Sequence, residues 1–290
     1  MSSHEQDVER SALALAGELA REAIELARGE RAIIDRKAHE FDIVTAADVA
    51  IENHFRQRIG ERFPDHAILG EEQGLDEEGR DWTWVVDPID GTFNYATGLP
   101  GAASSIALMH GSETRVGVIA DFALDTVFSC RKGAGMTWDR GSVPTDVGAA
   151  STLGRARLLI DPGHQAPDRV IFRALESFAE LALVVPRLIG SAAVSLAAVA
   201  LSGGCFVGTG LEIWDAAAGT LLADERGRVV LWWKYAGDTS HHVLAGDAEL
   251  VGALRPAMPD FVNAWRRKAD TTSTSKFRDE LLGPSANILL

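Results

Sequence analysis

The segment WVVDPIDGTFNY, residues 84–95, is the feature that most restricts how this chain can fold. It begins as an apolar strand pattern and then places two aspartates, Asp87 and Asp90, three positions apart. Pro88 favours an extended backbone at Asp87, and Gly91 permits a tight turn. Two carboxylates this close repel each other, and burying an unpaired carboxylate is unfavourable. We therefore expect a positive partner there: a helix end, a basic side chain or a metal ion.

The charge balance limits the classes of partner. The 290 residues include 28 lysines and arginines against 42 aspartates and glutamates, which gives a formal net charge of −14. DNA, RNA and anionic membranes bind through basic patches, so we expect neither a nucleic-acid partner nor a membrane partner. An anionic substrate would need a local source of positive charge.

Cysteine content and apolar runs predict a soluble cytoplasmic protein. Cys130 and Cys205 are too few for a disulfide framework and lack the paired spacing of a zinc site, so we interpret them as core residues. The N-terminal MSSHEQDVER is too polar for a signal peptide. The longest apolar runs are alanine-rich and shorter than the roughly 20 residues of a membrane span.

Periodicity predicts mixed helices and strands along the chain. Thr45 is a good N-cap, and Asp48 three residues later gives a capping box. The predicted helices are 6–28, 45–62, 167–180, 191–202, one that begins near Trp214, and 248–268. The predicted strands are a short one within 63–74, then 82–86, 103–111, 115–130, 156–161, 181–185, 205–208, 228–233 and 241–246. We expect 103–111 and 115–130 to form an antiparallel pair joined near Gly111.

Acids lie where predicted strands end or helices begin, and this pattern indicates a metal site. They are Glu71, Glu72, Asp87, Asp90 and Asp215. Taken singly, Asp215 could cap a helix and the two glutamates could line a solvated loop. Taken together, oxygen ligands without cysteine or histidine favour Mg²⁺, which would also bring positive charge to a phosphate. Backbone amides near Gly91 and Thr92 would hold the other side of that phosphate.

At this point the chain resembles the inositol monophosphatase family, within the superfamily that includes the fructose-1,6-bisphosphatases. The resemblance rests on five motifs in family order: DIVTAADVAIE (42–52), LGEEQG (69–74), WVVDPIDGTFNY (84–95), GSAAVSLAAVA (190–200) and GLEIWDAAAG (210–219). It implies an α/β (α+β) fold, a layered α-β-α-β-α sandwich of the sugar phosphatase type.

The change of pattern near residues 145–152 predicts a division of the chain there. Residues 1–148 form an N-terminal half with the metal-binding acids and the DPIDGT motif. Residues 149–255 form a C-terminal half with the GSAA and WDAAAG motifs. Residues 256–290 form a C-terminal helix and a mobile tail, in which the polar run 266–276 is solvated.

The ligand set implied by the resemblance holds two to three Mg²⁺ ions. Glu71, Asp87 and the backbone carbonyl of Ile89 would hold the first ion. Asp87, Asp90 and Asp215 would hold the second, and Glu71 would help to place a third. The implied reaction is hydrolysis of a phosphate monoester by an activated water, without a covalent phosphoenzyme.

Further residues take roles by the same resemblance. Glu71 with Thr92 would position and deprotonate the attacking water, and Asp48 would hydrogen-bond toward Thr92. Lys37 would add positive charge near the site. The residues expected to contact the substrate, a small phosphorylated metabolite, are Asp90, Gly91, Thr92, Gly190, Ser191, Ala192 and Asp215. The resemblance also implies a homodimer and sensitivity to lithium.

Two departures from the family pattern leave the substrate open. Phe93 replaces a threonine, and Gly208 stands where inositol-specific members carry a glutamate that binds the sugar hydroxyls; Glu212 is a possible substitute. The alternatives are fructose-1,6-bisphosphate, histidinol phosphate, a 3′-phosphoadenosine nucleotide, or a binding relative without turnover. A haloacid-dehalogenase-type phosphatase is disfavoured because two residues, Pro88 and Ile89, separate the aspartates.

Overall fold

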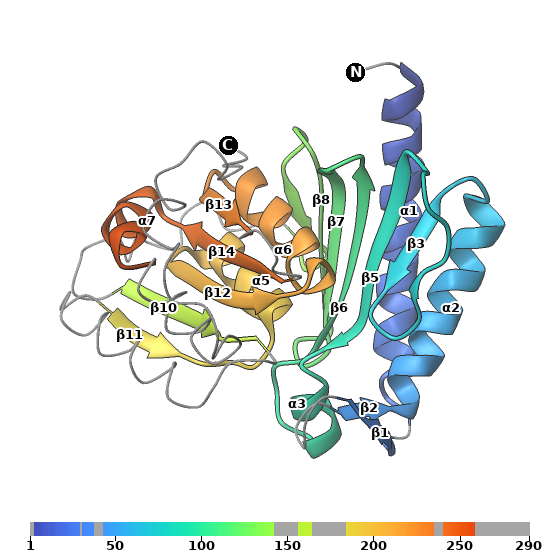
Figure 1. Cartoon of the computed structure of the whole chain (residues 1–290), viewed down its shortest axis with the longest axis horizontal. Helices are drawn as coiled ribbons and strands as arrows, with labels where there is room; N and C mark the ends of the chain where they lie inside the picture. Colours follow the sequence, from blue (N-terminus) through green and yellow to red (C-terminus); the bar gives the residue numbers. More distant parts are fainter. Residues whose placement is uncertain are drawn as a thin grey trace, which may run out of the picture.

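The computed structural model describes residues 3–29, 31–37, 43–141, 156–163, 184–234 and 240–258. Within these ranges, helices and sheets alternate in the layers that Figure 1 shows edge-on. Two helices, α1 (Ser3–Leu26) and α2 (Ala46–Arg62), cover one face of the larger sheet. Helices α5 (Ala192–Ser202) and α6 (Ile213–Glu225) lie between the two sheets, and α7 (Ala248–Leu254) covers the smaller sheet. The predicted α-β-α-β-α sandwich is confirmed.

The first two helices form as their sequences predict. One face of α1 is rich in alanine and leucine, and this face is buried against the larger sheet. At the start of α2, Asp48 Oδ2 accepts hydrogen bonds from Thr45 N (2.8 Å) and Thr45 Oγ1 (2.5 Å). The predicted capping box is therefore confirmed. None of the described helices is long and apolar enough to cross a membrane.

The larger sheet contains seven strands among the described residues. Their spatial order is β4 (Gly74–Leu75), β3 (Ala67–Gly70), β5 (Trp82–Asp90), β6 (Ala103–His110), β7 (Glu113–Asp121), β8 (Thr126–Arg131) and β9 (Met136–Trp138). The prediction of a single strand over 115–130 was wrong. Asp121 Oδ1 accepts a hydrogen bond from Leu124 N (2.9 Å), which closes a turn between β7 and β8.

Strand β5 extends further than its apolar pattern indicates. It continues through Asp90, and its register with β6 shifts between Asp87 and Asp90. Pro88 has no N–H to donate, and its carbonyl accepts a hydrogen bond from Ser104 Oγ instead. The register shift in β5 lies between the two aspartates, and both are at the end of β5 nearest to the starts of α5 and α6.

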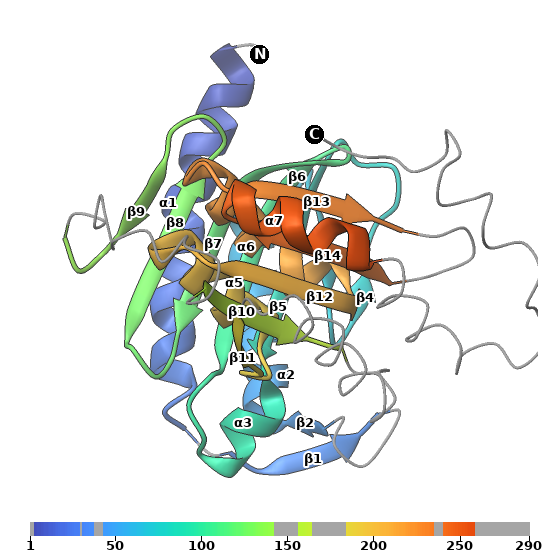
Figure 2. The ribbon, with the colours of Figure 1, turned by 90° about the vertical axis from the view of Figure 1, so that its left-hand side faces the viewer.

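The smaller sheet brings three strand ends to one edge. Within the described residues its spatial order is β11 (Val184–Arg187), β10 (Ala156–Asp161), β12 (Cys205–Leu211), β14 (His241–Gly246) and β13 (Val229–Trp233). Figure 2 shows this sheet behind α7. Because β10, β11 and β12 are parallel, their carboxyl ends meet at the same edge. Both α5 and α6 begin just beyond that edge, after β11 and β12.

Some predictions fall outside the described residues. These are the helix over 167–180, the boundary near 145–152 and the polar run 266–276. The predicted last helix begins as α7, followed by a short 3₁₀ helix at Arg255–Ala257. The short elements β1 (Ile33–Arg36), β2 (Ile43–Thr45) and α3 (Thr92–Thr97) lie together beside the end of β5 (Figure 1).

A ring cluster where β3 and β5 begin contains a histidine that is held neutral. His66 stacks on Phe63 at 4.7 Å and on Trp82 at 5.8 Å between ring centroids. Its Nδ1 accepts a hydrogen bond from Trp84 Nε1 (3.2 Å), which requires an unprotonated nitrogen. Burial lowers the pKa of His66 to about 4, although Asp65 opposes this shift.

The first prediction concerns stability against pH. Below pH 6.5 the unfolded chain binds a proton at His66, whereas the folded chain does so only near pH 4. The free energy of unfolding is therefore highest above pH 6.5 and falls as the pH drops toward 4. His66→Asn keeps an acceptor for Trp84 but does not titrate. We expect the wild type to lose roughly 1–3 kcal/mol more than this variant between pH 6.5 and 4.5, measured by urea unfolding. The exposed control His4→Asn should follow the wild type, and parallel curves for His66→Asn and wild type would contradict the assignment.

Candidate active site

Three aspartates from distant parts of the chain meet between the two sheets. Asp87, Asp90 and Asp215 are buried, and each offers a carboxylate oxygen within 4.8 Å of those of the other two. The first two lie at the end of β5, and the third lies in the first turn of α6. Ser105 on β6, the register partner of Asp87, donates a hydrogen bond to Trp214 O (2.8 Å). This bond holds the start of α6 against β6, next to the register partner Asp87, and so brings Asp215 beside Asp87.

The cluster is electrostatically unfavourable by itself. Burial, followed by the charges of Glu71, Asp90 and Asp215, raises the pKa of Asp87 well above its ordinary value. Burial and the charge of Asp90 likewise raise the pKa of Asp215. Asp87 Oδ1 is buried and accepts no hydrogen bond from any described residue. A buried carboxylate oxygen without a donor has the chemistry of a cation ligand.

Asp90 is held by the start of α5. Its Oδ2 accepts hydrogen bonds from Ser191 Oγ (2.5 Å) and from Ala193 N (2.7 Å). Ser191 is also the N-cap of α5, because its Oγ accepts a bond from Val194 N (3.1 Å). The structure therefore brings the predicted segment Gly190–Ala192 to Asp90.

Close packing explains the glycines at this junction. Gly91 has φ +86°, and a Cβ there would lie 2.5 Å from Gly101 O and 2.9 Å from Gly190 O. Asn94 on α3 donates hydrogen bonds to Gly101 O (2.8 Å) and Ile189 O (2.7 Å). No larger residue fits at position 91 without moving this loop. The role of Asn94 in joining α3 to the segment before α5 was not predicted.

Asp215 has a capping role as well as a place in the cluster. It is the third residue of α6, and its Oδ2 accepts a hydrogen bond from Glu212 N (2.8 Å). Asp215 is therefore both a capping residue of α6 and a member of the carboxylate cluster, the two alternatives that the sequence left open. An acid in the first turn also interacts favourably with the helix dipole.

Glu71 approaches the cluster from the turn after β3. Glu71 is not in the group of acids whose ligand oxygens lie within 4.8 Å of one another, but its charge contributes to the raised pKa of both Asp87 and Asp215. Lys37 Nζ forms ion pairs with Glu71 (2.8 Å) and Glu72 (2.9 Å). Burial alone would lower the pKa of Lys37, but the charge of Glu71 raises it on balance. Lys37 is thus paired with two acids of the turn after β3, at the position where the resemblance implied a positive charge.

The hydroxyl of Thr92 and the carboxylate of Asp48 lie next to each other beside the cluster. Thr92 Oγ1 lies 2.7 Å from Ile89 O and 3.4 Å from Asp48 Oδ1, so its single proton has two acceptors within reach. Burial raises the pKa of Asp48 to about 6, against the hydrogen bonds from Thr45 that lower it. Phe93, which follows Thr92, is 42% exposed.

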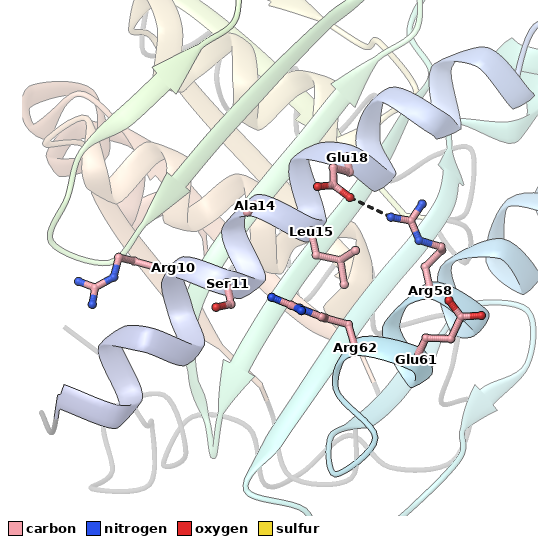
Figure 3. Close-up of a pocket in the computed structure, with 8 residues that line it drawn as sticks. All are labelled: Arg10, Ser11, Ala14, Leu15, Glu18, Arg58, Glu61 and Arg62. Atoms are coloured by element: carbon pink, nitrogen blue, oxygen red, sulfur yellow. Dashed lines mark hydrogen bonds and ion pairs between the residues drawn. The ribbon is translucent and has the colours of Figure 1, made fainter.

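A separate groove lies between α1 and α2 on the outer face of the molecule (Figure 3). It encloses about 650 Å³ and is lined by Arg10, Ser11, Ala14, Leu15, Glu18, Arg58, Glu61 and Arg62. The Arg58 guanidinium pairs with Glu18 (2.8 Å) across it. The groove contains none of the acids described above and so offers no comparable chemistry.

Comparison with known proteins agrees with this arrangement. The model of the inositol monophosphatase family matches residues 3–262. Inositol-1-monophosphatase SuhB of Mycobacterium tuberculosis is 34% identical over 275 residues, which cover 85% of this chain and 93% of that protein. Inositol monophosphatase 1 of Rattus norvegicus is 28% identical, covering 74% and 79%. The structure of inositol monophosphatase from Anabaena superposes with a TM-score of 0.71 at 30% identity, covering 86% and 96%. The chain belongs to the inositol monophosphatase family.

Proposed function

We propose that this protein is a Mg²⁺-dependent phosphatase that hydrolyses a small phosphate monoester, either inositol monophosphate or a related sugar or polyol phosphate. The observation that supports this most directly is the buried group of Asp87, Asp90 and Asp215, with ligand oxygens within 4.8 Å of one another. Family membership supports phosphatase chemistry at this group. The many negative charges then serve to bind cations, which in turn attract a phosphate.

The donor set fits a hard divalent cation. Carboxylate and carbonyl oxygens are the ligands that Mg²⁺ prefers, and Asp87 Oδ1 lacks a partner among the described residues. Glu71, Asp87 and the carbonyl of Ile89 would hold one ion, and Asp87, Asp90 and Asp215 a second, with Glu71 toward a third. When bound, Mg²⁺ supplies positive charge that lowers the pKa of a water and stabilises the leaving alkoxide.

The chain itself would orient the attacking water and take its proton. Glu71 and the Thr92 hydroxyl would fix the water, since Thr92 is held at the end of β5 by Ile89 O. Asp48 Oδ1 lies within reach of the same hydroxyl, and its raised pKa, about 6, suits proton transfer near neutral pH. Burial of Asp48 would therefore serve the reaction, because it raises the pKa of this carboxyl toward neutral pH.

Backbone groups would bind the phosphate. Amides at the start of a helix have no intrahelical acceptor, and α5 starts at the segment Gly190–Ala192 beside Asp90. Gly91 and Thr92 would contribute amides from the opposite side. Small residues at both places let the phosphate approach the backbone closely.

The substrate class depends on what replaces the missing glutamate. Gly208 is enclosed, because a Cβ there would meet Leu211 Cδ1 at 2.5 Å and Phe206 Cε1 at 2.8 Å. Glu212 accepts a hydrogen bond from Ser240 Oγ (3.2 Å) and caps α6, so it is committed to the fold. On the neighbouring strand, Asp161 is the register partner of Gly208 and contributes to the raised pKa of Asp215. A carboxylate therefore still lies beside the place of the glutamate, which favours a hydroxyl-bearing substrate.

The second prediction tests the activity. Purified protein should release phosphate from inositol 1-phosphate or another member of a panel with fructose-1,6-bisphosphate, histidinol phosphate and 3′-phosphoadenosine 5′-phosphate. Release should require Mg²⁺ and stop with chelator. Asp90→Asn should lower kcat/KM by at least about 100-fold, because it weakens charge stabilisation in the transition state. The exposed Glu77→Gln serves as the control, and no Mg²⁺-dependent release from any ester would refute the proposed function.

The third prediction concerns the stability cost of the cluster. Because the folded-state pKa of Asp87 is raised, its contribution to stability is lost as the pH rises above the ordinary carboxyl range. Asp87→Asn does not titrate and should unfold about 3–8 °C higher than wild type in chelator at pH 7.5. Added Mg²⁺ should stabilise the wild type but not this variant.

Asp65→Asn makes the same change of charge at a side chain that is 91% exposed, and it should match the wild type in both conditions. A lower Tm for Asp87→Asn in chelator would show that the cluster is not strained by its own charges.

A further inference from the structure

The turn from Glu71 to Gln73, between β3 and β4, must hold Glu71 toward the aspartates. The turn is only partly buried, and Lys37 attracts Glu71 and Glu72 together. Its position is therefore set by contacts with other elements. Glu71 N donates a hydrogen bond to Val86 O on β5 (3.3 Å), and the two residues that follow Glu71 are bound from α2.

Glu52 on α2 binds the backbone of the turn with both carboxylate oxygens. Its Oε2 accepts a hydrogen bond from Glu72 N (2.8 Å), and its Oε1 accepts one from Gln73 N (3.1 Å). The residue is fully buried. Hydrogen bonds to a charged acceptor are stronger than neutral ones, and losing them in a buried place is costly. Rotation of the turn would break one bond or the other.

Arg56, one helical turn further along α2, balances the charge of Glu52. Its Nε donates a hydrogen bond to Glu52 Oε1 (2.9 Å), and its guanidinium also donates to Gly74 O (2.6 Å). The Glu52–Arg56 pair therefore binds the backbone at Glu72, Gln73 and Gly74, on the side of the turn that leads into β4. The paired carboxylate also adds little repulsion to the nearby acidic cluster.

Gly70 makes room for this contact. A Cβ at position 70 would overlap the Glu52 carboxylate. The Gly70 backbone is not in the left-handed region, so space and not conformation requires a glycine. The last residue of β3 and the Glu52 side chain are thus fitted to each other.

We propose that Glu52 is a positioning residue that orients Glu71 toward Asp87 and Asp215, with Arg56 and Gly70 completing the clamp. The Glu52 oxygens accept hydrogen bonds from Glu72 N, Gln73 N and Arg56 Nε, so Glu52 would act on Glu71 through the backbone of the turn. The inference rests on the proposed function in one respect, namely that these acids bind Mg²⁺.

The test is the Mg²⁺ affinity of the purified full chain, measured by titration calorimetry and by the Mg²⁺-dependent rise in Tm. In Glu52→Gln an NH₂ group replaces one acceptor and faces a backbone N–H. We expect affinity about 10- to 100-fold weaker than in the wild type. Glu52→Asp keeps the charge but withdraws by one methylene, and it should weaken binding to a smaller degree. If Glu52→Gln does not fold, Glu52→Asp decides the question.

Glu9 provides a matched control. It is also fully buried and pairs with two arginines, Arg115 (2.7 Å) and Arg131 (3.2 Å), but it joins α1 to β7 and β8. Glu9→Gln should lower Tm in chelator while Mg²⁺ affinity stays within about twofold of wild type.

Wild-type affinity in the Glu52 variants would overturn the proposal. Equal weakening in Glu9→Gln would also overturn it, because affinity would then follow global stability. The proposed function fails separately, if the wild type itself shows neither Mg²⁺ binding nor Mg²⁺-dependent phosphate release.

Discussion

Carboxylates that repel one another are buried together at the junction of the two sheets, and the surrounding structure is arranged around that repulsion. Asp90 is stabilised by the Ser191 hydroxyl and the Ala193 amide, and Asp215 by the Glu212 amide. Asp87 has an oxygen without any described donor. Backbone donors at two helix starts therefore offset part of the charge, and the remainder favours cations at this place.

The middle helical layer is what allows the junction to form. Helices α5 and α6 are rich in alanine and lie between the sheets, where small side chains let them approach both faces. At Gly117 on β7 a Cβ would come within 2.8 Å of Ala218 O, so α6 lies almost directly on the larger sheet. The helix starts then fall where the end of β5 meets the carboxyl ends of the parallel strands. This is a common location for ligands in sheets of this kind.

Among the described residues, the fully buried Glu9 and Glu52 show that the fold uses charge for two different purposes. Glu9 binds two arginines and joins a helix to the larger sheet, which serves the fold alone. Glu52 binds two backbone amides and Arg56, and it holds the turn that contains a candidate ligand. A buried ion pair of either kind is poor evidence for net stability. The reason to keep Glu52 is better sought in the geometry of the site.

Local pattern was enough to predict the capping box of Thr45 and Asp48, the strand before Asp87 and the helix after Trp214, because such features depend on neighbours along the chain. The motifs together also indicated the family. The resemblance implied that Asp215 lies with Asp87 and Asp90. Tertiary structure decided that Ser191 and Ala193 bind Asp90 and that the turn at Asp121 divides the predicted strand. Periodicity specifies which face of an element is buried. It does not specify which distant element covers that face, since that depends on how whole layers pack.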